Sequence, residues 1–511
     1  MNISIRKGNL EEQTCDLLIV NRFSDEKKLT GSASDVDRAL GDKLSQIAKE
    51  EGFKGEGGET LLLRSLGTFS GKRVLLVGLG AQKEFTSEVV RDVSAQAYQS
   101  ARKLRANHVV SVLHGAGGGG LLATDCGRAQ VEGLRLGAYE FNKLKKTPDE
   151  KPHEVKTWEI VTNEGTHLRN AKRGMEVGEM TTRGIILARD LVNEPSSDMH
   201  PKALVNVAER IVKESKGKIK MKLYTKVEMK KMGMGGVLGV AQGSEHDPLF
   251  VHLEYDGRGS KSGKAGSGRV GKRISIVGKA VTFDSGGLSL KPAQYMETMK
   301  CDMAGAAAVL GAFSVLAELQ PKLHIDGIFA AVENMPSGTA MRPGDVLKAM
   351  NGKTMEVLNT DAEGRLTLAD ALSYASTLKP DYLIDLATLT GACVAALGEE
   401  ITGLMGNTLD FNAKVMQAGL DAGELIWPLP LEKRYRKLID SKIADMQNIG
   451  GKYGGALTAG LFLQEFVGEN IKWIHLDIAG PAFAERPMNA YTQYGGTGVG
   501  VATLLELLRS L

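Results

Sequence analysis

Two short stretches of this 511-residue chain, Gly278–Asp302 and Asn359–Leu366, carry acidic side chains among apolar and small residues. Carboxylates in such surroundings cannot share a buried site unless cations neutralise them. Four carboxylates balance the charge of two divalent ions, and oxygen ligands suit Mg²⁺, Mn²⁺ or Zn²⁺. A pair of such ions lowers the pKa of a bound water and polarises a substrate carbonyl. The candidate metal ligands are the carboxylates of Asp284, Asp302, Asp361 and Glu363.

Basic side chains lie in the same two stretches. Lys279 stands five positions before Asp284. It is either a salt-bridge partner of the carboxylates or, as a neutral amine, a metal ligand, and its type and position leave both alternatives open. Lys291 and Arg365 are the other cationic groups of these stretches. Either could stabilise the oxyanion of a tetrahedral intermediate as a fixed positive charge.

Histidine contributes no recognisable metal motif. The nine histidines are dispersed and form no HExxH pattern. His475 stands in an apolar strand pattern, so we interpret it as a core histidine with a hydrogen-bond partner. The predicted site is therefore carboxylate-dominated. A phosphoesterase-like two-metal hydrolase uses the same carboxylate chemistry and is an alternative at this point.

The elements around the two stretches follow an α/β pattern. Asp361 and Glu363 are two residues apart, so we expect their carboxylates to point the same way at the end of an extended strand. Asp302 opens an alanine-rich helical run. The remaining expected strands are Ile274–Val277, Ile325–Ala331, Tyr382–Ala387 and Trp473–Ile478, and the expected helices are Gly305–Leu319, Leu366–Ser376 and Thr497–Leu511.

The first third of the chain alternates in the same way, which predicts a mostly parallel sheet covered by helices. The expected strands are Leu17–Val20, Thr60–Leu63, Val74–Val77 and His108–Leu113. The expected helices are Asp35–Glu50, Ser87–Leu104 and Ala129–Lys143.

The length of the chain favours two domains rather than one core. We expect an N-terminal α/β domain over 1–165, a linker helix over 166–192 and a catalytic domain over 193–511. The predicted fold class is α/β, with two domains that each contain a mostly parallel or mixed sheet flanked by helices and that are joined by the linker helix.

Two glycine-rich stretches follow predicted strands of the first domain. Val77–Gly80 lacks the third glycine of a dinucleotide fingerprint, and Gly115–Gly120 lacks the Lys-Ser/Thr ending of a phosphate loop. We interpret both as turns between a strand and a helix.

Composition narrows the functional classes. The formal charge of +3 gives little support for a nucleic-acid or membrane-surface role. The four cysteines are scattered and form no CxxC pair, which indicates a reduced, cytoplasmic setting.

The first residues do not resemble a signal peptide, and no uninterrupted apolar run approaches membrane-spanning length. We interpret the one concentrated basic stretch, Asp256 to Arg273, as a solvated surface loop.

The stretch Asn359–Leu366, NTDAEGRL, resembles the signature of the leucyl aminopeptidase family, the M17 cytosol aminopeptidases. The resemblance is strong over Ile186 to Leu511 and weaker over the N-terminal third. It is carried further by Val277–Lys291, Met299–Met303, Asp385–Ala392 and His475–Pro481.

This resemblance implies a metal-dependent aminopeptidase that releases bulky apolar, leucine-like residues from the N-termini of peptides. It implies two divalent ions per subunit, Zn²⁺ or Mn²⁺ with Mg²⁺ as a further candidate. Asp284 and Glu363 would bridge the two ions. Lys279 and Asp302 would complete the tighter site, and Asp361 the more exchangeable one.

The resemblance also assigns catalytic and pocket residues. Lys291 resembles the lysine that polarises the scissile carbonyl. Arg365 resembles the arginine that holds a bicarbonate ion, which acts as general base. The positions that match substrate-binding residues are Ser289, Met299, Thr388 and Gly391.

The resemblance implies a cytoplasmic homohexamer, a dimer of trimers, that acts on peptide substrates and has no membrane partner. Some bacterial relatives also serve as DNA-binding architectural or regulatory proteins, so a DNA-binding role of the same hexamer is a second hypothesis. The near-neutral charge argues against it, and the basic stretch Asp256 to Arg273 argues weakly for it.

Overall fold

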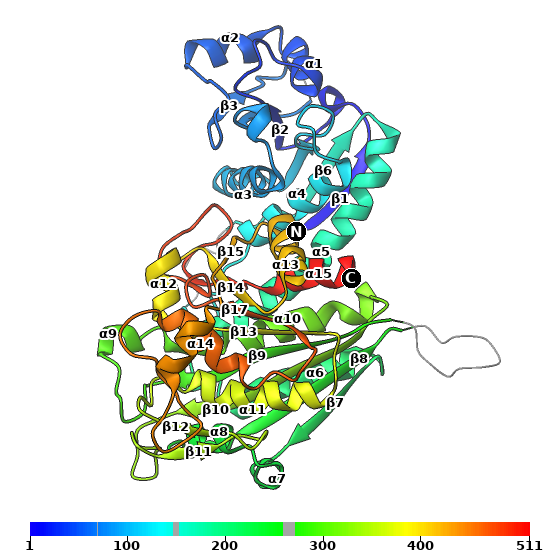
Figure 1. Ribbon diagram of the computed structural model, residues 1–511. Coiled ribbons are helices and arrows are strands. Elements are labelled where there is room, and N and C mark those ends of the chain that lie inside the picture. Colours follow the sequence, from blue (N-terminus) through cyan, green and yellow to red (C-terminus); the bar gives the residue numbers. More distant parts are fainter. Residues whose placement is uncertain (69, 147–152, 259–270) are drawn as a thin grey trace, which may run out of the picture. The chain divides into compact units, whose positions relative to one another are not determined.

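The computed structural model describes residues 1–68, 70–146, 153–258 and 271–511. The chain forms two compact units, Met1–Thr182 with Pro487–Gln493 and Arg183–Arg486 with Tyr494–Leu511. Each unit contains a β-sheet flanked by helices (Figure 1), and helix α5 (Gly165–Asn193) leads from the first into the second. The predicted α/β fold class is confirmed. Most of the predicted Asp256–Arg273 loop, residues 259–270, lies outside the described residues.

The first unit is built on a six-stranded sheet with the order β1-β6-β5-β2-β4-β3. Neighbouring strands are parallel except β3, which pairs antiparallel with β4 at one edge. The strands are β1 (Asn2–Lys7), β2 (Leu17–Arg22), β3 (Thr60–Arg64), β4 (Arg73–Gly78), β5 (His108–Val112) and β6 (Thr157–Thr162). The helices are η1 (Leu10–Glu12), α1 (Gly31–Ala39), α2 (Lys43–Glu50), η2 (Gln82–Glu84), α3 (Ser87–Lys103) and α4 (Ala123–Gly137).

Strand β2 shows why helices cover both faces of this sheet. Leu17 and Ile19 join one buried cluster, which includes residues of α3 and α4. Leu18 and Val20 join a second cluster, which includes residues of α1 and α2. Because successive strand residues point to opposite faces, an unbroken apolar run must be buried on both sides.

Two predicted helices of this unit differ from the structure. The expected helix 35–50 is two helices, because Gly41 and Asp42 have φ values of 65° and 60° and interrupt it. The expected helix 129–143 is α4, which begins six residues earlier at Ala123. An added Cβ at Gly127 or Gly133 would lie 2.5 or 2.1 Å from a carbonyl oxygen of α5 or α3. Gly127 lies before the predicted start of the helix, and both glycines permit close helix packing.

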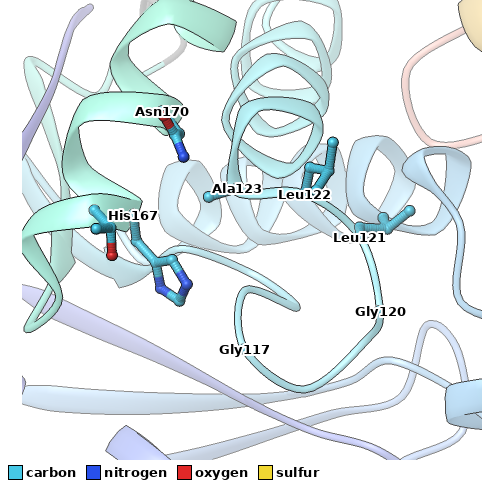
Figure 2. A pocket seen from close by; sticks show the side chains of 8 residues that line it. Gly117, Gly120, Leu121, Leu122, Ala123, His167 and Asn170 are labelled. Carbon is cyan, nitrogen blue, oxygen red and sulfur yellow. The ribbon is translucent and has the colours of Figure 1, made fainter.

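The glycine-rich stretch Gly115–Gly120 connects β5 to α4, as expected of a turn. An added Cβ at Gly115 or Gly119 would lie 2.1 or 2.2 Å from ring atoms of Phe85, so the loop packs directly on that ring. A hollow of about 420 Å³ lies between this loop and the first turn of α5 (Figure 2). Its lining includes no lysine or arginine and consists of Gly117, Gly120, Leu121, Leu122, Ala123, Thr166, His167 and Asn170.

The second unit is built on an eight-stranded mixed sheet with the order β15-β14-β17-β13-β9-β10-β8-β7. The central strands β17, β13, β9 and β10 are parallel. The strands of this sheet are β7 (Ile219–Tyr224), β8 (Leu249–Asp256), β9 (Arg273–Asp284), β10 (His324–Asn334), β13 (Tyr382–Ala387), β14 (Thr402–Gly406), β15 (Ile426–Pro428) and β17 (Lys472–Asp477). Two small sheets consist of β11 (Val346–Lys348), β12 (Thr354–Glu356) and β16 (Met446–Gln447), and of β18 (Phe483–Ala484) and β19 (Gly495–Gly496).

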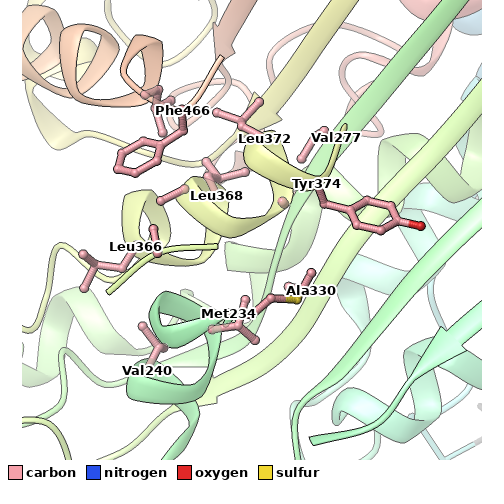
Figure 3. Packing of buried hydrophobic residues seen from close by; sticks show 14 of the residues in the cluster. Met234, Val240, Val277, Ala330, Leu366, Leu368, Leu372, Tyr374 and Phe466 are labelled. Carbon is pink, nitrogen blue, oxygen red and sulfur yellow. The ribbon is translucent and has the colours of Figure 1, made fainter. Parts of the chain in front are cut away.

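Helices flank the eight-stranded sheet. They are α6 (Pro201–Glu214), α7 (Lys226–Met232), α8 (Gly235–Ala241), α9 (Ala293–Met296), η3 (Met299–Met303), α10 (Ala304–Leu319), α11 (Gly364–Thr377), α12 (Gly391–Leu397), α13 (Leu409–Ala422), η4 (Lys433–Ile439), α14 (Gly455–Gln464) and α15 (Val501–Ser510). One large buried cluster of the unit joins α8, α11 and α14 to β9 and β10. Figure 3 shows Leu366, Leu368 and Leu372 of α11 within this cluster.

Three expectations for the second unit are corrected. Strand β9 continues beyond Val277 to Asp284, and Gly278 allows it to pass close to Gly305, whose carbonyl carbon lies 2.5 Å from where a Cβ would stand. Asp361 and Glu363 stand in a turn rather than at a strand end, and Glu363 has helical φ and ψ values of −75° and −35° before α11. The closing helix begins at Val501, because positive φ values at Gly498 and Gly500 precede it.

One helical stretch of the described residues, Ala293–Leu319, is long and apolar enough to cross a membrane by length and composition, which the sequence pattern did not predict. However, 78% of its most apolar window is buried inside the structure. A core helix has this property, and α10 packs beneath β9, β10 and β13.

Candidate metal centre

The carboxyl ends of three adjacent parallel strands meet at one edge of the eight-stranded sheet. Strand β9 ends at Asp284, β10 ends at Asn334, and Thr388 follows the end of β13. In open α/β sheets, ligands bind outside the carboxyl ends of the strands. The 3-10 helix η3 and the turn before α11 bring further carboxylates to the same edge. This arrangement places residues from four distant parts of the sequence in one neighbourhood.

The four predicted carboxylates lie together at this edge. Ligand atoms of Asp284, Asp361 and Glu363 all lie within 4.8 Å of one another. Asp302 is joined to them through Lys279, whose Nζ lies 2.7 Å from Asp302 Oδ1 and 2.9 Å from Glu363 Oε1. Asp284, Asp302 and Glu363 are almost fully buried, while Asp361 is partly open to solvent.

The electrostatic environment of the carboxylates favours the binding of cations. Burial raises the pKa of Asp302 well above its ordinary value, and the charges of Glu363 and Asp284 raise it further against the opposing effect of Lys279. Burial and Glu363 likewise raise the pKa of Asp284. Burial and Asp284 raise the pKa of Asp361. Additional positive charge would stabilise the ionised forms of all three.

The residues fit divalent ions. Among the described residues, Asp302 Oδ2 is buried and has no hydrogen-bond partner. A buried carboxylate oxygen without a donor is costly, and a metal ion is one partner that removes this cost. The donor set consists of carboxylate oxygens with one amine, which suits Mn²⁺, Mg²⁺ or Zn²⁺.

Two lysines balance part of the acidic charge. Burial acts to lower the pKa of Lys279, but Asp302 and Glu363 outweigh it and the net effect is an increase. Lys279 is therefore a salt-bridge partner in this structure, and its Nζ also donates to the Thr388 carbonyl at 2.9 Å. Lys291 Nζ lies 2.8 Å from Asp284 Oδ2 and 2.5 Å from Asp361 Oδ1, and the charge of Asp284 raises its pKa against the effect of burial.

Comparison with known proteins places this arrangement in a family. Residues 186–505 match the model of the cytosol aminopeptidase family, catalytic domain, and residues 19–148 match that of its N-terminal domain. The chain is 40% identical over 511 residues, 100% of both chains, to a probable cytosol aminopeptidase of Alkaliphilus oremlandii. It is 42% identical to that of Aquifex aeolicus, covering 93% of this chain and 92% of the relative.

Two solved structures share the fold of this chain over nearly their whole length. A tomato leucine aminopeptidase variant superposes with a TM-score of 0.87 at 34% identity, covering 100% of this chain and 97% of that chain. The bottromycin maturation enzyme BotP in complex with Mn superposes with a TM-score of 0.84 at 32% identity, covering 97% and 99% of the two chains.

The chain belongs to the cytosol aminopeptidase family. It is therefore a metal-dependent aminopeptidase, a hydrolase that acts on peptides. The comparisons favour neither the DNA-binding hypothesis nor a phosphoesterase-like hydrolase. Both matched domain models fall on this single chain, as the resemblance of the NTDAEGRL stretch implied.

Of the predicted substrate-binding positions, Thr388 contacts a carboxylate and Ser289 contacts the turn that carries Asp361. Thr388 Oγ1 donates to Asp302 Oδ1 at 2.7 Å. The backbone N–H of Ser289 donates to Thr360 Oγ1 at 2.7 Å, beside Asp361. Met299 is the first residue of η3, which carries Asp302. Gly391 begins α12, and no neighbouring group of the described residues lies within 4 Å of where a Cβ would stand.

Arg365 lies in the first turn of α11, almost fully buried. Its Nη1 donates to the Asn448 carbonyl at 2.8 Å, whereas its Nε–H donates to no residue in the described ranges. Burial lowers its pKa to about 10. The guanidinium therefore retains donor capacity for an anion.

Two asparagines at the site were not predicted from the sequence. Asn334 Nδ2 donates to Asp284 Oδ1 at 2.8 Å and to the Thr360 carbonyl at 3.0 Å. Asn448 makes several bonds to the turn that carries Asp361. Neutral amides have no charge pattern or metal-ligand spacing, so only the position of Asn334 at the end of an apolar strand could have pointed to one of them.

Proposed function

We propose that this aminopeptidase uses two divalent ions to release bulky apolar residues from unblocked peptide N-termini. The convergence of Asp284, Asp361 and Glu363 within 4.8 Å carries the proposal. Asp284 and Glu363 would bridge the ions, and Asp361 would complete the more exchangeable site. Lys279 and Asp302 would complete the tighter site, and Lys279 would lose its proton when it binds an ion as a neutral amine. Bound divalent ions supply a water nucleophile at neutral pH and a Lewis acid for the carbonyl.

Lys291 is the proposed catalytic cation. Its side chain is only 15% exposed, so its charge acts where little water screens it. We propose that its ammonium group stabilises the oxygen of the scissile carbonyl as negative charge develops there. Its position next to Asp284 and Asp361 supports this role.

Arg365 is the proposed bicarbonate-binding residue. A buried guanidinium whose Nε has no partner among the described residues suits a small planar anion. Arg365 would hold a bicarbonate ion there, and the chemistry that this ion would supply is that of a general base.

The substrate side chain would lie against Met299, Thr388 and Gly391, with Ser289 nearby. Open space beside Gly391 and the thioether of Met299 suit an apolar group of leucine size. We further propose a homohexamer, a dimer of trimers, in the cytoplasm. Residues 1–165 would serve oligomerisation or regulation, and residues 193–511 would carry catalysis.

Hydrolysis of aminoacyl anilides tests the proposal. Metal-depleted protein would be assayed with leucyl, methionyl, alanyl and glycyl anilides after addition of Mn²⁺ or Zn²⁺. We expect activity only with metal and a higher kcat/KM for the leucyl than for the glycyl substrate. Equal kcat/KM values would overturn the apolar preference, and turnover without metal would overturn the metal mechanism.

A further inference from the structure

The turn that carries Asp361 and Glu363 has no regular secondary structure to hold it. Residues 357–363 lie between β12 and α11. Their backbone does not continue the pairing of β12 with β16, whose last residue pair is Glu356–Gln447. Something else must fix the turn, because a metal site loses affinity when its ligands are not held in place.

Asn448 follows directly after β16 and is fully buried. Its Oδ1 accepts from the Leu358 N–H at 2.8 Å and the Asn359 N–H at 3.3 Å. Its Nδ2 donates to the Asn359 carbonyl at 2.7 Å and the Ala362 carbonyl at 3.4 Å. The side-chain amide therefore supplies the hydrogen bonds that a neighbouring strand would otherwise give to this part of the backbone.

The backbone of Asn448 fixes two further groups. Its N–H donates to the Glu356 carbonyl at 2.9 Å, which extends the β12–β16 ladder by one bond. Its carbonyl accepts from Arg365 Nη1 at 2.8 Å. One residue, about 85 positions away in sequence from the turn it holds, thus contacts both the ligand turn and the predicted anion-binding arginine.

We infer that Asn448 is a positioning residue that holds the Leu358–Glu363 turn in its metal-binding conformation. The chemistry of the site explains the residue type. An amide offers both a donor and an acceptor to the backbone, and it adds no fifth negative charge to a site that already contains four carboxylates. The inference rests on the proposed two-metal function, because it concerns how tightly Asp361 and Glu363 bind an ion.

The test measures Mn²⁺ binding to metal-depleted protein by calorimetry, with Asn448→Ala as the main variant. This variant removes the amide but keeps the carbonyl that Arg365 contacts. We expect the affinity of the weaker Mn²⁺ site to fall by about 10–100-fold, the range for groups that support metal ligands. The second variant is Asn448→Ser, whose hydroxyl cannot bond both sides of the turn. Its affinity for Mn²⁺ at the weaker site should also fall.

Gln130→Ala is the matched control. Gln130 is a fully buried amide of the first unit that also bonds backbone on both sides, accepting from the His114 N–H at 3.2 Å and donating to the Val112 carbonyl at 3.0 Å. The Gln130→Ala substitution should lower the melting temperature without changing the affinity for Mn²⁺.

Three results are decisive. Wild-type affinity in a folded Asn448→Ala or Asn448→Ser variant would overturn the inference, as would an equal loss in Gln130→Ala. Failure of the wild-type protein to bind a second Mn²⁺ would instead overturn the proposed two-metal function. A selective loss in the Asn448 variants would support both.

Discussion

Replacement of Lys291 by methionine tests whether one ammonium group stabilises the transition state. Methionine keeps much of the apolar stem and removes the charge. In the structure this charge lies 2.8 Å from Asp284 Oδ2 and 2.5 Å from Asp361 Oδ1. Since Lys291 is not a proposed ligand and competes with an ion for these oxygens, the variant should bind Mn²⁺ at least as well as the wild-type protein.

The expected kinetic loss follows from the position of the charge. Two unit charges about 4 Å apart interact by about 4 kcal/mol at an effective dielectric constant of about 20. Loss of one oxyanion stabiliser costs about 2.7–4 kcal/mol, or about 10²–10³ in kcat. Lys291 is 15% exposed, so we expect a loss of this size rather than that of a surface charge. The effect should appear in kcat with little change in KM, because the negative charge develops only in the transition state.

The assay is steady-state hydrolysis of leucyl anilide with saturating Mn²⁺, together with metal analysis of the same samples. Lys353→Met is the control, because Lys353 pairs with Glu465 on the same unit but outside the site. We expect it to retain wild-type kcat. A Lys291→Met enzyme with near-wild-type kcat would refute the reasoning, and loss of bound metal would show that Lys291 acts through the metal site instead.

Three further predictions concern the carboxylates. Glu363→Ala should abolish activity and bound metal, because it removes a ligand shared by both ions; an active variant would contradict the bridging role. Thr388→Val removes the 2.7 Å hydrogen bond to Asp302. Because a hydrogen bond to a charged group contributes roughly 1.5 kcal/mol, Mn²⁺ affinity measured by calorimetry should fall about tenfold. The free energy of unfolding of metal-free protein should fall as pH rises above about 4, because the raised pKa values of Asp284, Asp302 and Asp361 make the folded chain bind more protons than the unfolded one. The increase in melting temperature on adding Mn²⁺ should therefore be larger at about pH 8 than at about pH 5, and the opposite order would contradict this sign.

Residue chemistry and apolar runs were sufficient to predict much of this molecule. Unbroken apolar runs such as Tyr382–Ala387 became central strands, because only a sheet covered on both faces buries them. The neighbourhood of the four carboxylates could be anticipated because buried acidic groups must share cations. His475 is also a paired core histidine, with Nδ1 at 2.5 Å from Asp385 Oδ1.

Features that depend on tertiary contacts could not be predicted. The break between α1 and α2 rests on left-handed backbone at Gly41 and Asp42. The six residues of α4 before the predicted start include Gly127, whose close packing against α5 a single sequence does not reveal. The turn at Asp361 is held by an asparagine far along the chain, and no spacing rule connects the two.

The most direct test of the central claim is the number of Mn²⁺ ions that the metal-depleted chain binds. Equilibrium dialysis should give two Mn²⁺ per chain for the wild-type protein and one for Asp361→Asn, since Asp361 is proposed to complete only the more exchangeable site. Fewer than two ions in the wild-type protein would contradict the claim that the buried carboxylates are held together by a pair of divalent ions.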